Sequence, residues 1–395
     1  MYKKLESLKN LKSKKVLLKL DLNLSFLKNG KVDPENAFRV EASLKTIKYL
    51  ISKKTKIAII SYIGRPDGSY DAKYKMDKVA LVLSKYLNKK VKKLNSALAG
   101  DISNDILKMK DSEVVLLENI RFYKEEMVND DKMASDLAKL FDIYVNDAFS
   151  NAHREHMSAC AISKYLPSYM GFRFDYEIKE LNKVLKTKFK NAILIMGGAK
   201  ADTKLPVISK LISKFDKVLV GGVIANNFLY SRNISIGKSL FEEKLIKATK
   251  KIDSKKIIIP VDVVVSKNID EKSKFQIKDI KNIEKDDIIL DIGPRTIKIY
   301  LDYIKRAKFI LWNGPLGYFE FKKYRRATEL MIKEIKKSRA IKYSGGGETV
   351  GLLGELKMKN AFNFISTGGG AMLEFLSGKK LPGITYLEKN KLKIK

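Results

Sequence analysis

Arginine side chains stand directly after short apolar runs in the first half of the sequence, a spacing typical of a site for anions. Three of them are Arg65, Arg121 and Arg154. If the runs are parallel strands, their carboxyl ends meet at one sheet edge, where ligands of open α/β sheets bind. Guanidinium groups pair with phosphate or carboxylate through two parallel hydrogen bonds. With Arg39, the pattern predicts four guanidinium groups around a small polyanion rather than a long polymer.

The segments 21–23 and 61–66 also follow apolar runs and bring Asp21, Asn23 and Tyr62 to the same predicted edge. A structural explanation stays open for each arginine alone, because a surface arginine commonly pairs with a nearby acid. The joint pattern favours a binding site, since arginine is scarce in this chain: eleven of its 79 basic residues are arginine.

Glycine clusters follow the predicted strands of the second half. They are Gly197-Gly198-Ala199-Lys200, Gly221-Gly222, Gly345-Gly346-Gly347-Glu348-Thr349 and Gly368-Gly369-Gly370. Glycine lets backbone N–H groups approach a phosphate, and a following helix N-terminus adds partial positive charge. A tight strand-to-helix turn also selects glycine. Four clusters in one half nevertheless favour a phosphate-binding lobe.

The standard nucleotide motifs are missing. Gly237-Lys238-Ser239 resembles the end of a P-loop, but Arg232 stands where that motif needs glycine, so the tripeptide is interpreted as incidental. No Gly-x-Gly-x-x-Gly follows a strand in the first unit of either series. This disfavours a dinucleotide-dependent oxidoreductase.

Short apolar strands alternate with helical spacing along the chain. The predicted strands lie at 16–20, 56–60, 114–117 and 143–145, and then at 192–196, 218–220, 257–259, 309–312, 340–343 and 364–365. Helical spacing occurs at 42–52, 76–87 and 132–140, and a further helix at 175–186 would join the two series. The sequence therefore predicts an α/β fold with two doubly wound parallel sheets.

The domains expected from this pattern are 1–171 together with about 376–395, a joining helix within 172–187, and 188–375.

The charge of the chain needs its own explanation. The 395 residues carry 79 Lys+Arg against 45 Asp+Glu, a net charge of +34. A nucleic acid or another polyanion is one possible partner. Because lysine dominates and is scattered among acids and apolar residues, a solvated surface is the favoured interpretation. One cysteine and two histidines exclude a Cys/His zinc site, and without a signal-like or membrane-length run the chain is expected to be cytoplasmic and soluble.

Ordered blocks of sequence resemble one family, the phosphoglycerate kinases, over nearly the whole chain from Val16 to Gly383. The blocks include 21–23, 64–66, 116–122, 145–149, 152–154, 197–200, 291–294, 312–320, 345–349 and 366–370. The resemblance implies two Rossmann-like lobes hinged by a helix, with the C-terminal tail returning to the first. It implies the reaction 1,3-bisphosphoglycerate + ADP ⇌ 3-phosphoglycerate + ATP, Mg²⁺ as the cofactor, and a monomer.

The resemblance also implies the site residues. The first lobe would hold 3-phosphoglycerate through Asp21, Asn23, Arg39, Tyr62, Arg65, Arg121 and Arg154. The second would hold the nucleotide through Lys200, Lys204, Gly221, Gly222, Asn313, Pro315, Glu320 and Gly345, Gly346, Gly347, Glu348 and Thr349. Arg39, Lys200 and Lys204 would be catalytic, the backbones of Gly346 and Gly369 would donate to the transition state, and Glu348 would hold the metal.

Both nucleophiles of this reaction are already ionised at neutral pH, so no general base is needed. What transfer needs is positive charge on the migrating phosphoryl group, and closure of the lobes would exclude water.

Three departures from the family pattern stand in the site: Tyr62 in place of histidine, Glu348 in place of aspartate, and Ser150-Asn151 in place of Gly-Thr. Tyr62 and Glu348 leave open a second interpretation, a catalytically weakened protein that binds polyanions through its lysines.

Overall fold

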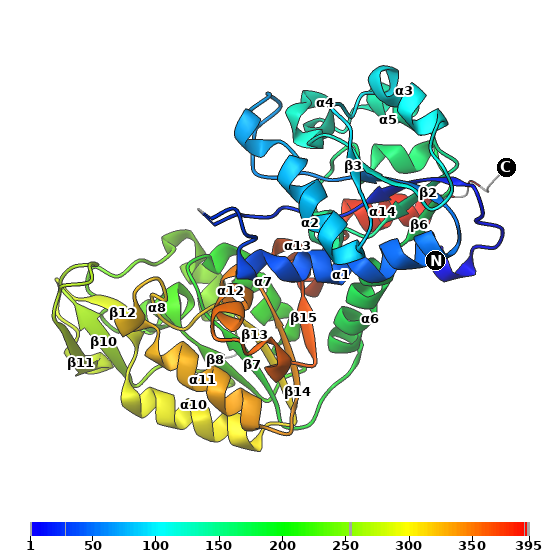
Figure 1. Ribbon diagram of the computed structural model, residues 1–395. Coiled ribbons are helices and arrows are strands. Elements are labelled where there is room, and N and C mark those ends of the chain that lie inside the picture. The colour runs from blue at the N-terminus through cyan, green and yellow to red at the C-terminus, as the bar shows by residue number, and fades with distance from the viewer. Residues whose placement is uncertain (1, 28, 253–254, 391, 393–395) are drawn as a thin grey trace. The chain divides into compact units, whose positions relative to one another are not determined.

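The computed structural model of the chain describes residues 2–27, 29–252, 255–390 and 392, and it divides the chain into two compact units. Unit 1 comprises Met1–Glu180 and Lys380–Lys395, and unit 2 comprises Leu181–Lys379. Each unit is built on its own parallel sheet with helices against its faces (Figure 1).

The sheet of unit 1 has six strands in the order β3-β4-β2-β1-β5-β6, all parallel. The strands are β1 (Lys15–Lys19), β2 (Lys56–Ile60), β3 (Lys92–Lys93), β4 (Val114–Leu116), β5 (Ile143–Asn146) and β6 (Ser168–Met170). The chain starts in the middle, winds to one edge and then to the other. Its order reverses between β1 and β5, so this is the switch point at which such sheets bind ligands.

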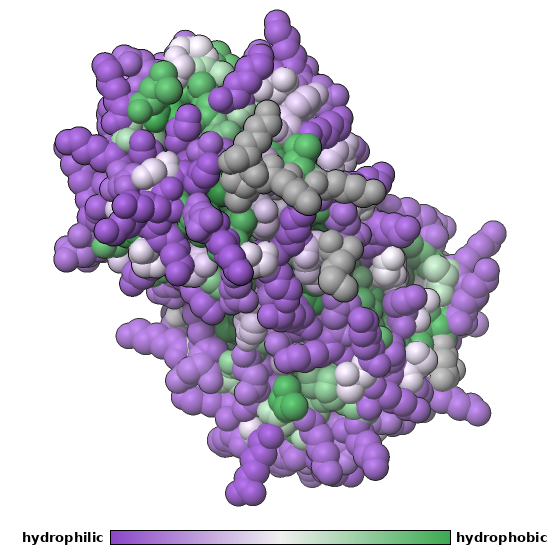
Figure 2. Space-filling view, turned by 90° about the vertical axis from the view of Figure 1, so that its right-hand side faces the viewer, coloured by the Kyte–Doolittle hydropathy of each residue, from purple (hydrophilic) through white to green (hydrophobic). Residues whose placement is uncertain are grey.

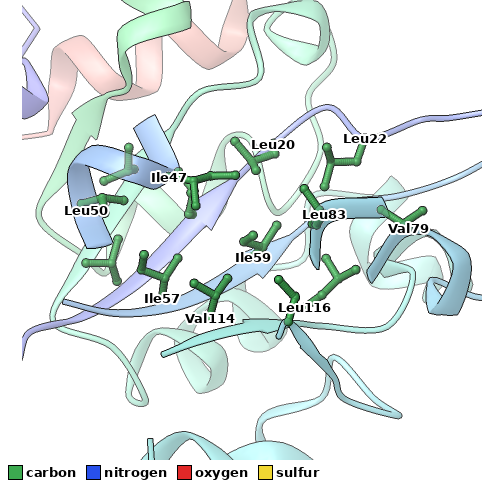
Figure 3. Packing of buried hydrophobic residues seen from close by; sticks show 14 of the residues in the cluster. Leu20, Leu22, Ile47, Leu50, Ile57, Ile59, Val79, Leu83, Val114 and Leu116 are labelled. Carbon is green, nitrogen blue, oxygen red and sulfur yellow. The ribbon is translucent and has the colours of Figure 1, made fainter. Parts of the chain in front are cut away.

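The strands of unit 1 are apolar because their side chains are buried in its hydrophobic core. Helices α1 (Pro34–Ser52) and α2 (Asp77–Leu87) lay Ile47, Leu50, Val79 and Leu83 over one face of the sheet (Figure 3). Ile57 and Ile59 of β2 and Val114 and Leu116 of β4 meet them there. Each such side chain contributes about 1.5–3 kcal/mol when fully buried. This packing fixes the strand ends that carry the polar segments.

The remaining α-helices that lie wholly within unit 1 include one from the C-terminal part of the chain. They are α3 (Ala99–Leu107), α4 (Lys124–Met127), α5 (Asp131–Ala138) and α14 (Pro382–Lys389). Asn390, directly after α14, accepts a hydrogen bond from Ser168 N at 3.1 Å and donates one to Leu166 O at 2.9 Å. These bonds tie the segment after residue 380 to the edge strand β6.

Helix α6 (Phe172–Lys186) contains the boundary between the units, which falls between Glu180 and Leu181. It begins three residues before the predicted start because side chains of unit 1 cap its first turn. Phe174 N donates to Asp147 Oδ1 at 2.9 Å, and Phe172 N donates to Thr46 Oγ1 at 3.1 Å. Burial raises the pKa of the Asp147 carboxyl to about 7.

The sheet of unit 2 is also six-stranded and parallel, in the order β15-β14-β13-β7-β8-β9. The strands are β7 (Ala192–Met196), β8 (Lys217–Val220), β9 (Ile257–Ile258), β13 (Phe309–Asn313), β14 (Ile341–Gly345) and β15 (Phe364–Ser366). The chain again starts in the middle, and the switch point lies between β7 and β13. The predicted α/β class with two doubly wound parallel sheets is confirmed.

Unit 2 also contains a separate antiparallel sheet that was not predicted from the sequence. It contains β10 (Asp262–Ser266), β11 (Phe275–Asp279) and β12 (Ile288–Ile292), with β10 in the centre. The sequence of β11, Phe-Gln-Ile-Lys-Asp, alternates apolar and polar residues, and its Phe275 and Ile277 are exposed. A search for continuous buried runs does not detect such a strand.

Seven helices of unit 2 are described. They are α7 (Ala201–Leu211), α8 (Gly222–Ser231), α9 (Ile246–Lys251), α10 (Pro294–Arg306), α11 (Arg326–Lys337), α12 (Gly347–Glu355) and α13 (Gly370–Leu376). Helices α10 and α11 lie side by side (Figure 1) and bury Tyr300, Ile304, Met331 and Ile335 in one core cluster. Helices α7, α8, α12 and α13 each begin within a few residues of a strand end, so their N-termini lie near the carboxyl edge of this sheet.

The face in Figure 2 is covered mainly by hydrophilic residues, with small scattered hydrophobic patches. Among the described residues, the search for a helix both long and apolar enough to cross a bilayer found none.

Candidate active site

Asp21 lies just beyond β1, at the switch point of unit 1, and is buried. Its Oδ2 accepts hydrogen bonds from Arg39 Nη1 of α1 and from Ser150 Oγ, the latter at 2.5 Å. Its Oδ1 accepts one from Asn23 N at 3.2 Å. The carboxylate therefore orients a guanidinium group of α1 while tying the segments after β1 and β5 together.

The segments after β2 and β4 join the same cluster through Arg121. Arg121 Nη1 donates to Gly64 O at 2.9 Å, and Gly64 N donates to Asn23 Oδ1 at 2.8 Å. The Arg121 guanidinium carbon lies 3.6 Å from the centroid of the Tyr62 ring. Asn151 Nδ2 donates to the Tyr62 hydroxyl at 3.0 Å.

These contacts form a closed circuit through the ends of four strands. It runs from Asp21 to the Ser150-Asn151 turn, to Tyr62, to Arg121, to Gly64 and through Asn23 back to Asp21. The structure thus brings together five of the seven predicted ligands of the three-carbon acid, listed as Asp21, Asn23, Arg39, Tyr62 and Arg121.

Arg65 and Arg154, the other two predicted ligands, are exposed. Within the described residues neither side chain makes a hydrogen bond or an ion pair. The surface-salt-bridge explanation considered for each arginine is therefore wrong for these two. Arg39 does pair with an acid, but that acid, Asp21, belongs to the cluster itself.

Sequence reasoning did not assign Asn119, Ser150 or Asn151. Asn119 is fully buried and donates to Ile63 O at 2.8 Å and to Tyr74 O at 2.9 Å, holding the segment after β2 against the segment after β4. The detectable signal was their place after predicted strands, which is also what marked the arginines.

A buried polar cluster lies beneath the Tyr62 ring. Lys19 Nζ of β1 is 5.6 Å from the ring centroid, 3.6 Å from Glu126 Oε1 and 2.5 Å from Ser158 Oγ. Burial lowers the pKa of Lys19 and, to about 4, that of His156, whose Nδ1 lies 3.7 Å from Glu126. His156 is thus a packed, neutral histidine.

The loops at the switch point of unit 2 are pressed against one another. Gly197 N donates to Asn313 O at 3.0 Å, and Gly222 N donates to Leu316 O at 2.9 Å. A Cβ on Gly221 would lie 2.8 Å from Leu316 Cα. Close backbone approach alone therefore requires glycine at these positions. A structural reason for these glycines, rather than phosphate binding, is the alternative that the sequence left open.

Two other predicted glycines face open space. A Cβ on Gly347 or on Gly369 would meet no described atom within 4 Å. Gly347 opens α12, and Gly369 precedes α13 with a φ of +46°. These positions leave room for a phosphate to approach the backbone, unlike Gly197 and Gly221.

Lys204 lies in the second turn of α7 with its side chain buried, and its Nζ donates to Gly197 O. Burial lowers its pKa, and Glu348 opposes that shift. Within the described residues Lys204 has no carboxylate at ion-pair distance. Lys200, at the N-cap of the same helix, is exposed. A buried ammonium without an anionic partner is costly, so the arrangement favours an anionic ligand here.

Asn313 and Thr349 hold the loop after β13 to the loop after β14. Asn313 Nδ2 donates to Gly345 O at 2.8 Å, and Gly314 N donates to Thr349 Oγ1 at 2.8 Å. Both side chains are buried. Between the loops, Gly346 has a φ of +99°, which glycine adopts without strain.

A cavity of about 430 Å³ opens beside these loops. Its lining is mainly apolar and also includes the predicted residues Gly222, Pro315, Glu320 and Glu348. Sequence reasoning missed its apolar wall, which includes Val223, Leu229, Leu240, Pro260, Ile289 and Leu290. Part of that wall belongs to the antiparallel sheet. Because this sheet was not predicted, its contribution to the cavity was not predicted either. The cavity has the size and polarity of a nucleoside site.

Lys238 also lines this cavity, although the tripeptide 237–239 does not act as a P-loop. A Cβ on Gly237 would lie 2.6 Å from Glu284 O, so close packing explains the glycine.

Glu348 is suited to a magnesium ion that a nucleotide brings with it. The carboxylate is exposed, and a Cβ on Gly198 would lie 3.2 Å from its Oε2. Mg²⁺ keeps several waters and is commonly bound by one or two carboxylates plus substrate phosphates.

A separate acidic group, Glu284, Asp286 and Asp287, has metal-like spacing among the described residues. Lys267 Nζ lies 2.7, 2.5 and 2.9 Å from these three carboxylates, and Lys278 Nζ lies 2.8 and 2.9 Å from two of them, so lysines already offset most of the group's charge.

Comparisons with known proteins agree with this geometry. The family model described as phosphoglycerate kinase matches residues 5–379. Curated phosphoglycerate kinases from Dictyoglomus turgidum and Buchnera aphidicola are 42% and 41% identical; each alignment covers 96% of this chain, and 96% and 97% of those relatives.

Solved structures give the same result. Phosphoglycerate kinase from Coxiella burnetii aligns with a TM-score of 0.84 at 34% identity, over 99% of this chain and 100% of that one. The enzyme from Pyrococcus horikoshii aligns with a TM-score of 0.85 at 32% identity, over 98% of each chain. The resemblance seen in the sequence is confirmed. This chain therefore belongs to the phosphoglycerate kinase family, whose reaction is the reversible transfer of a phosphoryl group from 1,3-bisphosphoglycerate to ADP.

Proposed function

We propose that unit 1 binds the three-carbon acid, that unit 2 binds the magnesium nucleotide, and that a phosphoryl group passes directly between the two ligands. The observation that carries this assignment is the circuit around Asp21 and Arg121, together with the exposed Arg65 and Arg154, which pair with no acid among the described residues. Four guanidinium groups offer a small phosphorylated carboxylate several bidentate partners at once.

In unit 2, the apolar cavity suits the nucleobase and Glu320 at its edge suits a ribose hydroxyl. The phosphates would then reach Lys204, Lys200 and the open backbone at Gly347 and Gly369. Glu348 would hold Mg²⁺, which supplies positive charge to the β- and γ-phosphates when it is bound. Asn313 and Thr349 would act by fixing the loops.

The chemistry needs positioning more than proton transfer. The carboxylate of 3-phosphoglycerate attacks the γ-phosphorus in line as the bond to the ADP oxygen breaks, and the reverse step uses an ADP oxygen as nucleophile. Both nucleophiles are ionised at pH 7, so no residue has to act as a base. Arg39, Lys200 and Lys204, with backbone N–H groups of Gly346 and Gly369, would stabilise charge on the migrating group.

The two ligands must come within bonding reach for transfer to occur, so we propose hinge bending that involves α6. We also propose that the chain acts as a cytoplasmic monomer. Sedimentation of the purified chain tests the oligomeric state, and imaging of a tagged chain in cells tests the location.

A coupled assay of 3-phosphoglycerate-dependent ADP formation tests the function. Wild-type chain should turn over, while Arg39→Ala and Lys204→Ala should each lose about a hundredfold or more in kcat, since each removes a charge from the transition state. Arg306→Ala and Lys336→Ala, at exposed positions of α10 and α11, are matched controls and should match wild type.

Wild-type turnover no higher than that of Arg39→Ala and Lys204→Ala would overturn the proposal. Salt-sensitive binding of RNA together with such a result would instead favour the polyanion-binding interpretation.

A further inference from the structure

The turn Phe149–Asn151 after β5 carries two side chains that reach into the cluster of unit 1. Ser150 Oγ donates to Asp21 Oδ2, and Asn151 Nδ2 donates to the Tyr62 hydroxyl. Asn151 itself is buried, with 5% of its surface exposed. Two of the departures from the family pattern, at positions 62 and 150–151, therefore contact each other directly.

Tyr62 is packed between protein groups. Only 6% of its surface is exposed, its hydroxyl accepts from Asn151, and its ring faces the guanidinium of Arg121 and the ammonium of Lys19. Burial raises its pKa to about 12, so the phenol stays neutral at physiological pH. A neutral, buried side chain whose hydroxyl already contacts Asn151 offers an anionic substrate little.

Arg121 depends on that ring for its orientation. Nη1 donates to Gly64 O at 2.9 Å, but Nε is buried and has no hydrogen-bond partner among the described atoms. The ring, 3.6 Å from the guanidinium carbon, is the other group that fixes the plane. An arginine held in its binding geometry loses less side-chain entropy when an anion arrives.

We propose that Tyr62 is a positioning residue, whose ring holds the Arg121 guanidinium in the plane that receives 3-phosphoglycerate, and that Asn151 holds the ring. The proposal rests on the proposed function of unit 1. It assigns Tyr62 no contact with substrate, in contrast to the ligand role expected from the resemblance.

Substitutions that keep or remove the ring separate these roles. Tyr62→Phe keeps the stack and should leave the KM for 3-phosphoglycerate within about threefold of wild type. Tyr62→Leu removes it and should raise that KM about tenfold, with kcat and the KM for ATP changed by less than about twofold. Tyr86→Leu, at an exposed tyrosine of α2, is the matched control and should have no effect.

A double-mutant cycle tests whether the effect passes through Arg121. Lysine cannot stack as a planar guanidinium does, so Tyr62→Leu should change KM by less than about twofold in an Arg121→Lys background. Asn151→Ala should raise KM about threefold in the wild-type background and leave it unchanged beside Arg121→Lys. This second variant carries the test if Tyr62→Leu does not fold.

Equal effects of either variant in the two backgrounds would overturn the proposal, as would a KM for Tyr62→Leu equal to that of wild type. Calorimetry can measure the affinity of each variant in the same cycle for 3-phosphoglycerate, and this measurement does not require turnover. A wild-type chain that binds this ligand but does not turn over would therefore overturn the proposed function alone.

Discussion

Two buried lysines show how surroundings decide what a charge can do. Burial lowers the pKa of both Lys19 and Lys204. Lys19 pairs with Glu126 inside unit 1, whereas Lys204 bonds only a backbone carbonyl among the described residues. An anion at Lys204 would supply the missing partner. The lysine whose charge is unpaired is thus the one suited to bind phosphate.

The carboxyl of Asp291, at the end of β12, should make stability depend on pH. It is buried, accepts from Ile292 N and Ala327 N, and burial raises its pKa to about 8. Between the unfolded pKa near 4 and about 8, the folded state holds a proton that the unfolded state has released. Its contribution to stability is therefore full below about pH 4 and is lost as the pH rises to about 8.

Asp291→Asn should accordingly flatten the decline of the unfolding free energy between about pH 5 and 8, measured by urea unfolding. Some slope should remain, because Asp147 shifts in the same direction. Asp302→Asn, at an exposed position, should keep the wild-type slope. An unchanged slope in Asp291→Asn would contradict the assignment.

At the scale of elements, the sequence was informative where strands are buried on both faces. Such strands read as continuous apolar runs, and β1, β2 and β7 were each located to within one residue. The polar segments after these strands could then be placed as well, because they begin where the strands end. β11 was missed because one of its faces is exposed and its apolar residues alternate with polar ones. The apolar wall of the unit 2 cavity was missed for a different reason: its sheet residues lie on β10 and β12, which were not predicted as strands.

Side-chain partners were less accessible to sequence reasoning. The bond from Asn151 to Tyr62 joins residues 89 positions apart, and no local pattern reports a contact of that separation. Likewise, glycine at 197 and at 347 looks the same in the sequence, although one packs against Pro315 and the other faces open space.

Helix α6 is expected to influence turnover from a distance. Lys179, exposed in its middle, pairs with Asp175. Lys179→Gly should weaken the helix by about 1 kcal/mol and lower kcat several-fold, with both KM values unchanged, if hinge bending needs a stiff helix. Lys179→Ala removes the same ion pair but keeps the helix, so it is the matched control. Equal kcat values for the two variants would contradict a role of helix stiffness.

At the scale of the whole molecule, the net charge of +34 acts on every anion that approaches. Phosphorylated substrates should therefore be attracted before they touch the site. Raising ionic strength from about 10 mM to 150 mM shortens the screening distance from about 30 Å to about 8 Å. We expect kcat/KM for 3-phosphoglycerate to fall over this range more steeply than kcat, as measured by steady-state kinetics. A kcat/KM independent of salt would remove this role.

The return of the chain to unit 1 has a consequence for biosynthesis. A ribosome releases residues in order, so the whole of unit 2 emerges before Asn390 can bond to Ser168 and Leu166. Unit 2 is a continuous segment and can complete its sheet during translation. Unit 1 emerges first yet is finished last, and until then the nascent chain carries β6 without the partners that the segment after α14 supplies.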